Sequence, residues 1–102
     1  MDIVVTFPKG DIDHWNEKVS YSYIAEQEVW WNMRKLPNNF SIDDKLFIVM
    51  DNEVRGFFEV KKIKFGDINK VFLKNFKSIK SIAMKGFQGF RYRRFEFEEE
   101  YE

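Results

Sequence analysis

Two neighbouring tryptophans and the basic residues after them are the side chains whose types and spacing best suggest chemistry. Trp30 and Trp31 are followed by Arg34 and Lys35. In an extended segment successive side chains point to opposite sides, so one indole can enter the core while the other faces a groove. An exposed indole stacks on an unpaired base, and nearby cations contact phosphate. These four residues are candidates for nucleic-acid binding, and burial of both indoles in the core or its rim is the alternative.

A second basic set lies near the C-terminal end of the chain. Its members are Lys85, Arg91, Arg93 and Arg94. Arg91 and Arg93 alternate with Phe90 and Tyr92, so in a strand they point away from the face that holds the aromatic rings. We expect this set to contact the phosphates of a nucleic acid. Simple solvation of an exposed strand is the alternative.

The distribution of charge agrees with an anionic partner, although the net charge of the chain is zero. Residues 61–94 hold eleven Lys or Arg and one Asp, a balance of +10, whereas residues 1–60 have a balance of −5. Residues 95–102 then carry five glutamates. Such asymmetry indicates an anionic partner, and the acidic end can neutralise the basic segment within the molecule. Lysines that only solvate exposed strands would give the same composition.

The residue types that most catalytic and metal sites need are scarce in this chain. It has no cysteine, which excludes disulfides and thiolate metal sites, and its single histidine is His14. No serine lies in a G-x-S-x-G turn, and Asp11, Asp13 and His14 match no recognised metal-ligand spacing. The stretch GFQG, residues 86–89, lacks the length and the lysine of a phosphate-binding loop. We therefore expect no catalytic residue, no metal and no cofactor.

A β-hairpin is the clearest structural signal in the sequence. Residues 45–50, KLFIVM, and residues 54–60, VRGFFEV, are apolar runs joined by a short turn at Asp51-Asn52. Gly56 within the second run predicts a β-bulge or the close approach of another backbone. The 102 residues fit one domain, which we expect to span residues 1–102.

The segments before this hairpin predict one strand and one helix. Residues 3–7 are β-branched and apolar, which favours a first strand. Ile12, Trp15 and Val19 fall on one face of a short helix. Residues 20–29 fit either a strand or a helix.

The segments after the hairpin complete a mostly β pattern. Residues 68–77 carry apolar side chains at a spacing nearer to a helical turn than to alternation, and residues 78–84 predict a strand. Together the elements predict an α+β fold: a small β-barrel of about five or six strands with one or two flanking helices.

The final stretch predicts a closing strand with an irregularity. Phe90 and Tyr92 share one face of a strand, and a bulge at Arg93-Arg94 would bring the later aromatic residues onto that same face. We expect the acidic end of the chain to fray from about residue 98.

A longer pattern runs through WWNMRKLPNNFSIDDKLFIVMDNEVRGFFEV, residues 30–60. A loop with Leu36-Pro37 leads through Asp43-Asp44-Lys45 into one strand, a tight turn and a second strand. This pattern, with the aromatic and basic residues at the C-terminal end, resembles the PUA-like superfamily, notably its ASCH and EVE branches. The ASCH signature G-x-K-x-x-E-x-R is absent, because residues 28–34 supply Arg34 but neither its glycine nor its lysine.

The resemblance implies a PUA-like barrel that binds RNA or modified bases in a cleft between the barrel and its helices. We therefore expect a nucleic-acid-binding module without catalysis, whose partner is RNA or another nucleic acid, single-stranded or with a modified base. A small ASCH-type hydrolase acting on RNA or a nucleoside through Tyr23, Lys35 and Glu59 is one alternative, and a protein-interaction module is another. The N-terminus lacks the basic start and the apolar length of a secretory signal, so we expect a cytoplasmic protein without a membrane partner.

Overall fold

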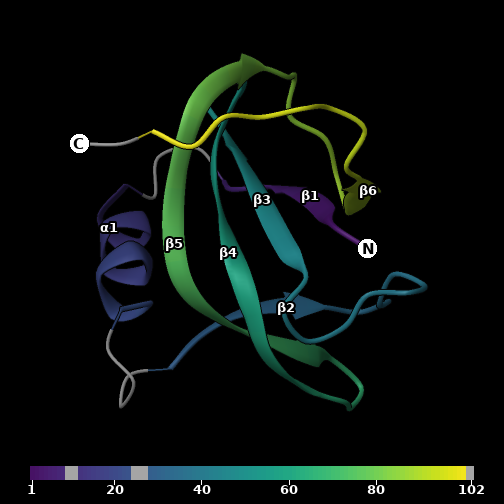
Figure 1. Cartoon of the computed structure of the whole chain (residues 1–102). Helices are drawn as coiled ribbons and strands as arrows, with labels where there is room; N and C mark the ends of the chain where they lie inside the picture. Colours follow the sequence, from purple (N-terminus) through teal and green to yellow (C-terminus); the bar gives the residue numbers. More distant parts are fainter. Residues whose placement is uncertain (9–11, 24–27, 101–102) are drawn as a thin grey trace.

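The computed structural model describes residues 1–8, 12–23 and 28–100 as a six-stranded mixed sheet with one helix (Figure 1). The helix, α1, spans Ile12–Tyr21. The strands are β1 (Ile3–Thr6), β2 (Val29–Met33), β3 (Lys45–Met50), β4 (Glu53–Lys64), β5 (Asn69–Ala83) and β6 (Phe90–Tyr92). Their order across the sheet is β2-β5-β4-β3-β1-β6, and the sheet curls into a half-barrel. The expectation of a small, mostly β, barrel-like domain is confirmed in this coarse form.

The predicted hairpin is confirmed as β3 and β4. Asp51 and Asn52 form its turn with φ angles of 54° and 61°. A two-residue hairpin turn needs this left-handed backbone, which Asp and Asn tolerate better than most residues. The predicted first strand is also confirmed as β1, which runs parallel to β3 and antiparallel to β6.

Both features that the sequence predicts for Gly56 are present. The register between β3 and β4 shifts beside Gly56, which lies opposite Ile48, and this shift is a β-bulge. On the other side β5 approaches so closely that a Cβ atom on Gly56 would lie 2.3 Å from the Lys77 carbonyl oxygen and 2.5 Å from Phe76 Cζ. Only glycine fits this position without a shift of the main chain.

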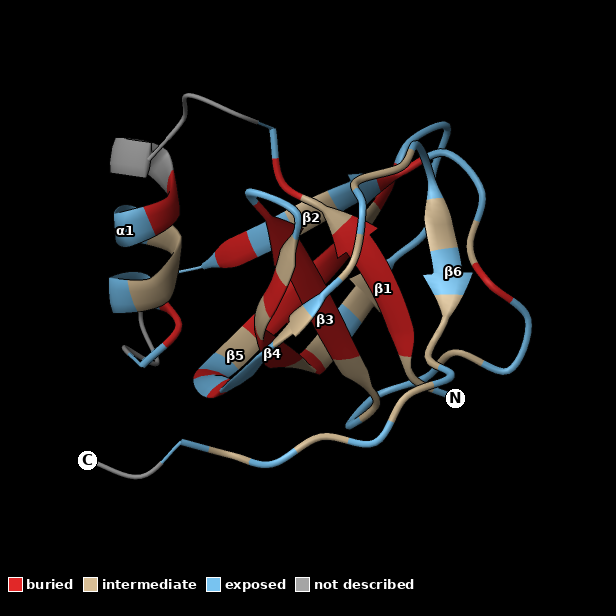
Figure 2. Ribbon diagram, turned by 90° about the horizontal axis from the view of Figure 1, so that it is seen from above, coloured by how far each residue is buried: buried red, intermediate tan, exposed pale blue. Residues whose placement is uncertain are grey.

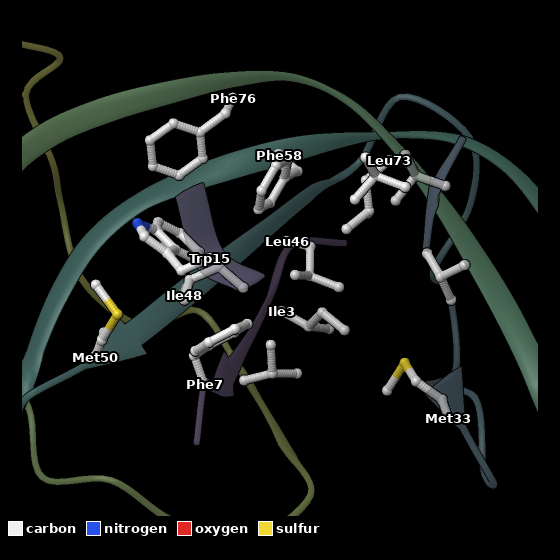
Figure 3. Packing of buried hydrophobic residues seen from close by; sticks show 14 residues of the cluster. Ile3, Phe7, Trp15, Met33, Leu46, Ile48, Met50, Phe58, Leu73 and Phe76 are labelled. Atoms are coloured by element: carbon white, nitrogen blue, oxygen red, sulfur yellow. The ribbon is translucent and has the colours of Figure 1, made fainter. Parts of the chain in front are cut away.

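Hydrophobic side chains pack into one cluster on each face of the sheet. The inner cluster includes residues of β1, β2 and β5, together with Phe7 and with Trp15 of α1 (Figure 3). β1 and β2 stand far apart in the strand order, so they share a cluster only because the sheet curls around it. The predicted helix is confirmed, and the Trp15 ring centroid lies 5.3 Å from that of Phe7 and 5.1 Å from that of Phe76.

The outer cluster lies on the opposite face of the sheet. Its buried members are Val4, Phe47, Val49, Val54, Phe57 and Ile79. Residues after β5, including Met84, Phe87 and Phe97, pack against it and are only partly buried. Figure 2 shows this gradient, with buried residues on β1 and the central strands and intermediate or exposed residues along the C-terminal segment.

Residues 68–77 belong largely to β5, so the predicted helical turn is wrong. Asn75 has a φ angle of 50°, and the pairing between β4 and β5 shifts register three times. Each irregularity breaks the alternation of a strand, so Val71 and Phe76 both reach the inner cluster although they lie an odd number of residues apart. In the sequence, the resulting spacing of apolar residues resembles that of an amphipathic helix.

The C-terminal aromatic residues do not share one face, contrary to the prediction of a restoring bulge at Arg93-Arg94. β6 ends at Tyr92, and Phe90 and Tyr92 pack against the inner cluster. Phe95 and Phe97 pack against the outer cluster. The chain therefore crosses to the other face of the sheet after β6, and the three-residue spacing from Tyr92 to Phe95 marks that change.

The acidic segment pairs with β5, although we expected fraying from about residue 98. Ile79 and Glu99 form an antiparallel bridge, and the Lys80 N–H donates to the Glu98 carbonyl at 2.9 Å. The Lys80 ammonium lies 2.6 Å from a Glu98 carboxylate oxygen. This segment covers part of the edge of β5 that β2 leaves unpaired, so backbone groups along that part of β5 have hydrogen-bond partners.

Candidate functional site

A groove runs along β2, at the seam where the curled sheet stays open. Its two halves have volumes of about 570 and 710 Å³ and share Thr6, Trp31 and Asn32. Trp31 is the middle residue of β2, which is one end of the strand order, and Thr6 ends β1, which pairs with β6 at the other end. The groove therefore lies between the two ends of the curled sheet. Trp31 lies where the two halves meet, with its ring centroid 6.1 Å from that of Phe7.

In the half next to α1, charges of both signs already interact. Its charged lining residues are Glu17, Lys18 and Glu28. Lys18 Nζ donates to the Trp30 carbonyl at 2.8 Å and lies 6.0 Å from the Trp31 ring. The hydrogen bond from Lys62 Nζ, 2.9 Å long, lowers the pKa of Glu28 below its ordinary value. This half therefore presents no uniform charge to a ligand.

In the other half, which we call the loop-side half, positive charge is present without an acidic residue. Besides the three shared residues, its lining consists of Met33, Arg34, Lys35, Phe87, Gln88, Gly89 and Phe90. None of these residues carries a carboxylate. Two cations, three aromatic side chains and the amide of Gln88 therefore surround one cavity. Such a set suits a planar anionic ligand, because rings stack on a base while cations contact phosphate.

The loop that closes this half is attached to β1. The Phe87 N–H donates to Thr6 Oγ1 at 3.0 Å. A Cβ atom on Gly86 would lie 3.1 Å from Thr6 Cγ2, so the backbone approaches β1 closely. Gly89 has a φ angle of +75°, which allows the chain to turn into β6. The wall opposite β2 is thus positioned by hydrogen bonding and packing.

The structure places Trp30 and Trp31 on opposite faces of β2, as predicted for an extended segment. Trp31 faces inward, packs against the inner cluster and lines the loop-side half with Arg34 and Lys35. Trp30 faces outward, is 39% exposed and packs on Phe72, with 6.0 Å between ring centroids. It also lines the half of the groove next to α1. The loop-side half therefore contains three of the four residues of this predicted set.

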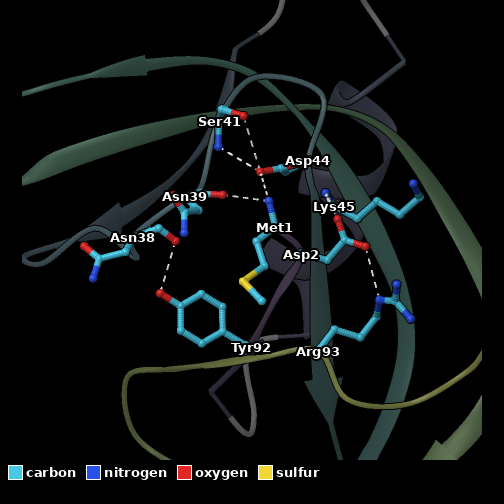
Figure 4. Close-up of polar contacts among 9 residues, drawn as sticks. All are labelled: Met1, Asp2, Asn38, Asn39, Ser41, Asp44, Lys45, Tyr92 and Arg93. Atoms are coloured by element: carbon cyan, nitrogen blue, oxygen red, sulfur yellow. Dashed lines mark hydrogen bonds and ion pairs between the residues drawn. The ribbon is translucent and has the colours of Figure 1, made fainter.

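Arg93 of the second predicted set makes contacts within the protein that hold the fold together. Its Nε lies 3.1 Å from Asp2 Oδ2 (Figure 4). Its Nη1 donates to the Phe95 carbonyl at 2.6 Å. Asp2 also accepts a hydrogen bond of 3.0 Å from the Lys45 N–H. Arg93 thus ties the C-terminal segment to the N-terminus and to β3, and it does not face the groove.

None of the other members of that set lines the groove, and only Arg91 is next to it. The Arg91 guanidinium lies 4.2 Å from the centroid of the Phe87 ring, on which it stacks. Because Phe87 is a wall of the loop-side half, Arg91 lies next to the groove. Lys85 and Arg94 are exposed and line neither half.

The residues of the hydrolase alternative do not come together. Lys35 lines the loop-side half, but Tyr23 and Glu59 line neither half of the groove. The Tyr23 hydroxyl donates to the Phe76 carbonyl, and Glu59 lies 3.7 Å from Lys77 Nζ. Among the described residues no group of three or more His, Asp or Glu side chains could hold a metal ion. The side chains of Asp11, Asp13 and His14 lie outside the described part.

Two groove residues, Phe87 and Gln88, were missed in the sequence. The pattern GFQG places an aromatic ring and an amide between two glycines, which is a signal for an exposed, closely packed loop. Nothing in the sequence shows that this loop faces β2, because the two segments are more than 50 residues apart.

Comparisons with protein-family models, with curated proteins and with solved structures find no match for this chain. In the part of the chain that the structure describes, no helix is long and apolar enough to cross a membrane.

Proposed function

We propose that this chain is a nucleic-acid-binding module without catalysis, of PUA-like form, that acts in the cytoplasm on RNA or a modified base. The observation that carries the proposal is the loop-side half of the groove. There Trp31, Phe87 and Phe90 lie around the same cavity as Arg34 and Lys35, and no acidic residue joins them.

Physical chemistry supports a single-stranded ligand. Stacking of one base on an aromatic side chain contributes about 1–3 kcal/mol, and it requires a base that is not already stacked in a duplex. Arg34 and Lys35 are exposed, so they reach the phosphates of such a ligand without being desolvated first. The amide of Gln88 adds a donor and an acceptor for base edges.

The architecture agrees with the PUA-like resemblance in outline. A curled mixed sheet with a helix against its inner face leaves an opening at the seam, and the resemblance implies a ligand between barrel and helices. The choice of RNA or a modified base as the proposed ligand rests on this resemblance and on the lining residues together.

Binding should be measured by fluorescence anisotropy with labelled single-stranded RNA and DNA at several salt concentrations. We expect Arg34→Ala/Lys35→Ala to weaken binding and to reduce the slope of log K against log salt by about 1.4, since each phosphate contact to a single strand contributes about 0.7. Trp31→Ala should weaken binding about tenfold, and Trp31→Phe should retain most of it.

Lys80→Ala is a matched control, because Lys80 is an exposed β5 lysine that pairs with Glu98 and lines neither half of the groove. It should bind as the wild type does. Absence of binding to every RNA and DNA probe, or binding that does not change with salt, would contradict the proposal.

One observation favours the protein-interaction alternative. Phe65 and Ile68, in the turn between β4 and β5, are 75% and 50% exposed. The turn is fixed by Asn69, whose Oδ1 accepts from the Gly66 N–H at 3.2 Å. A protein that co-purifies after nuclease treatment and is lost with Phe65→Ser/Ile68→Ser would support this reading.

A further inference from the structure

The outward face of β2, β5 and β4 carries a second group of aromatic and basic side chains. Trp30 of β2 is opposite Phe72 of β5, which is opposite Lys62 of β4. In the adjacent row, Lys70 of β5 is opposite Lys64 of β4. Alternate residues of a strand share a face, so these two rows form one surface. We call these five residues, Trp30, Lys62, Lys64, Lys70 and Phe72, the outer platform.

Contacts within the outer platform hold its exposed indole in place. The Trp30 ring packs on Phe72, which is only 7% exposed, with 6.0 Å between centroids. Lys70 Nζ lies 5.1 Å from the centroid of the Trp30 ring, and Lys62 Nζ lies 4.6 Å from that of Phe72. Trp30 therefore presents a supported ring to solvent, with ammonium groups beside it. A supported ring loses little conformational entropy when a flat ligand stacks on it.

The charge of the outer platform is positive and partly uncompensated. Lys62 pairs with Glu28 at 2.9 Å. Lys64 and Lys70 form no ion pair with any carboxylate in the described part of the chain. The pKa of Glu28 is lowered first by its hydrogen bond from Lys62 and further by the charges of Lys62, Lys61 and Lys64, which shows the positive potential at this edge. An anionic partner is complementary to this surface.

The outer platform and the groove meet at β2. Trp30 and Trp31 are successive residues, and they project to opposite faces of this strand. Among the described residues, β2 pairs with a strand on one side only. A flexible chain in the groove can therefore pass around the free side of β2 and reach the outer platform. A duplex cannot follow such a path, because it is stiff and its bases are stacked.

We propose that the outer platform is a second stacking site for the same ligand, so that the ligand is a single-stranded nucleic acid bound around the edge of β2. This inference rests on the proposed function of the groove. It specifies the ligand as a strand of at least about four nucleotides, at the lower end of single-strand binding sites. One base stacks on Trp31 and another on Trp30, and Lys64 and Lys70 contact phosphates between or beyond them.

The test compares labelled oligouridines of two and eight nucleotides by fluorescence anisotropy. We expect Trp30→Ala to weaken binding of the eight-nucleotide probe about tenfold and to leave binding of the two-nucleotide probe unchanged. Trp30→Phe should bind the longer probe within about threefold of the wild type, because a smaller ring still stacks. Lys64→Ala/Lys70→Ala should reduce the salt slope for the longer probe by about 1.4.

Lys80→Ala is again the matched control and should behave as the wild type. Thermal unfolding shows whether each variant is folded. If Trp30→Ala is unfolded, the double lysine variant decides, because both side chains lie outside the two hydrophobic clusters. Wild-type affinity of Trp30→Ala and of the double lysine variant for the longer probe, with loss only on Trp31→Ala, would overturn the inference and leave the groove proposal standing. Absence of wild-type binding to both oligouridines and to every other RNA and DNA probe would overturn the inference and the groove proposal together.

Discussion

Gly56→Ala should strongly destabilise the fold, because the new methyl group would meet main-chain atoms. The added Cβ would lie 2.3 Å from the Lys77 carbonyl oxygen and 2.5 Å from Phe76 Cζ, and real Cβ contacts essentially never fall below 3.0 Å. The Phe76 ring can move, but the carbonyl belongs to β5, so relief requires β4 and β5 to separate. Overpacking costs about 1–3 kcal/mol, and each lost ladder hydrogen bond adds about 1 kcal/mol. We expect a loss of about 3–5 kcal/mol.

Thermal unfolding followed by circular dichroism measures this effect. A domain of this size loses about 4–8 °C in Tm for each kcal/mol, so Tm should fall by at least about 12 °C. Gly66→Ala is the matched control, since its Cβ would find only the Ile68 carbonyl oxygen at 3.5 Å, an ordinary contact. It should stay within a few degrees of the wild type. A Gly56→Ala protein that melts within about 3 °C of the wild type would refute the close-approach reasoning.

The ionisation of Asp44 and the contacts of Arg93 give two more predictions. Burial raises the pKa of Asp44, but hydrogen bonds from the Met1 ammonium and the Ser41 N–H outweigh it, so the folded-state pKa lies below 3.8. Ionised Asp44 therefore stabilises the fold above about pH 3.8, and this stabilisation is lost as the pH falls through the folded-state pKa. In Asp44→Asn, Tm should decline less steeply with falling pH than in the wild type. Parallel declines of Tm in the two proteins would contradict this prediction. Arg93→Ala should cost about 2 kcal/mol by denaturant unfolding, because it removes a charged hydrogen bond to Asp2. The affinity of Arg93→Ala for RNA should stay within about twofold of the wild type. A tenfold loss of affinity in the folded variant would show that Arg93 contacts the ligand.

Local chemistry determined the parts of this fold that depend on neighbours in the chain. Asp51-Asn52 supplies the left-handed residues of a two-residue turn, so the β3–β4 hairpin follows from the sequence. Gly56 in an apolar strand predicts a bulge or a close approach of another backbone, and the structure has both. Trp30 and Trp31 take opposite faces because side chains alternate along any extended strand.

The structure of residues 68–77 and of the C-terminal segment could not be predicted from the sequence, because it depends on irregular pairing with distant strands. The bulges of β5 displace Phe76 by one residue from strict alternation, so the apolar spacing in residues 68–77 resembles that of a helix. The sequence predicts a bulge at Arg93-Arg94 that would keep Phe95 on the face of Tyr92. Instead the chain crosses after Tyr92, and Phe95 packs on the other face of the sheet. In both cases the register of a partner strand decides the position, and no single segment encodes that register.

The groove itself exists only in the tertiary structure. The sequence placed Trp31, Arg34 and Lys35 next to one another, because they lie within five residues. It did not place Phe87 and Gln88 opposite them, since that depends on how far the sheet curls and on where β1 ends. It also grouped Arg93 with Arg91, although the carboxylate of Asp2, at the other end of the chain, holds Arg93 in a structural contact. Residue types and strand alternation are local properties, whereas a cavity between two strand edges depends on the curvature of the whole sheet.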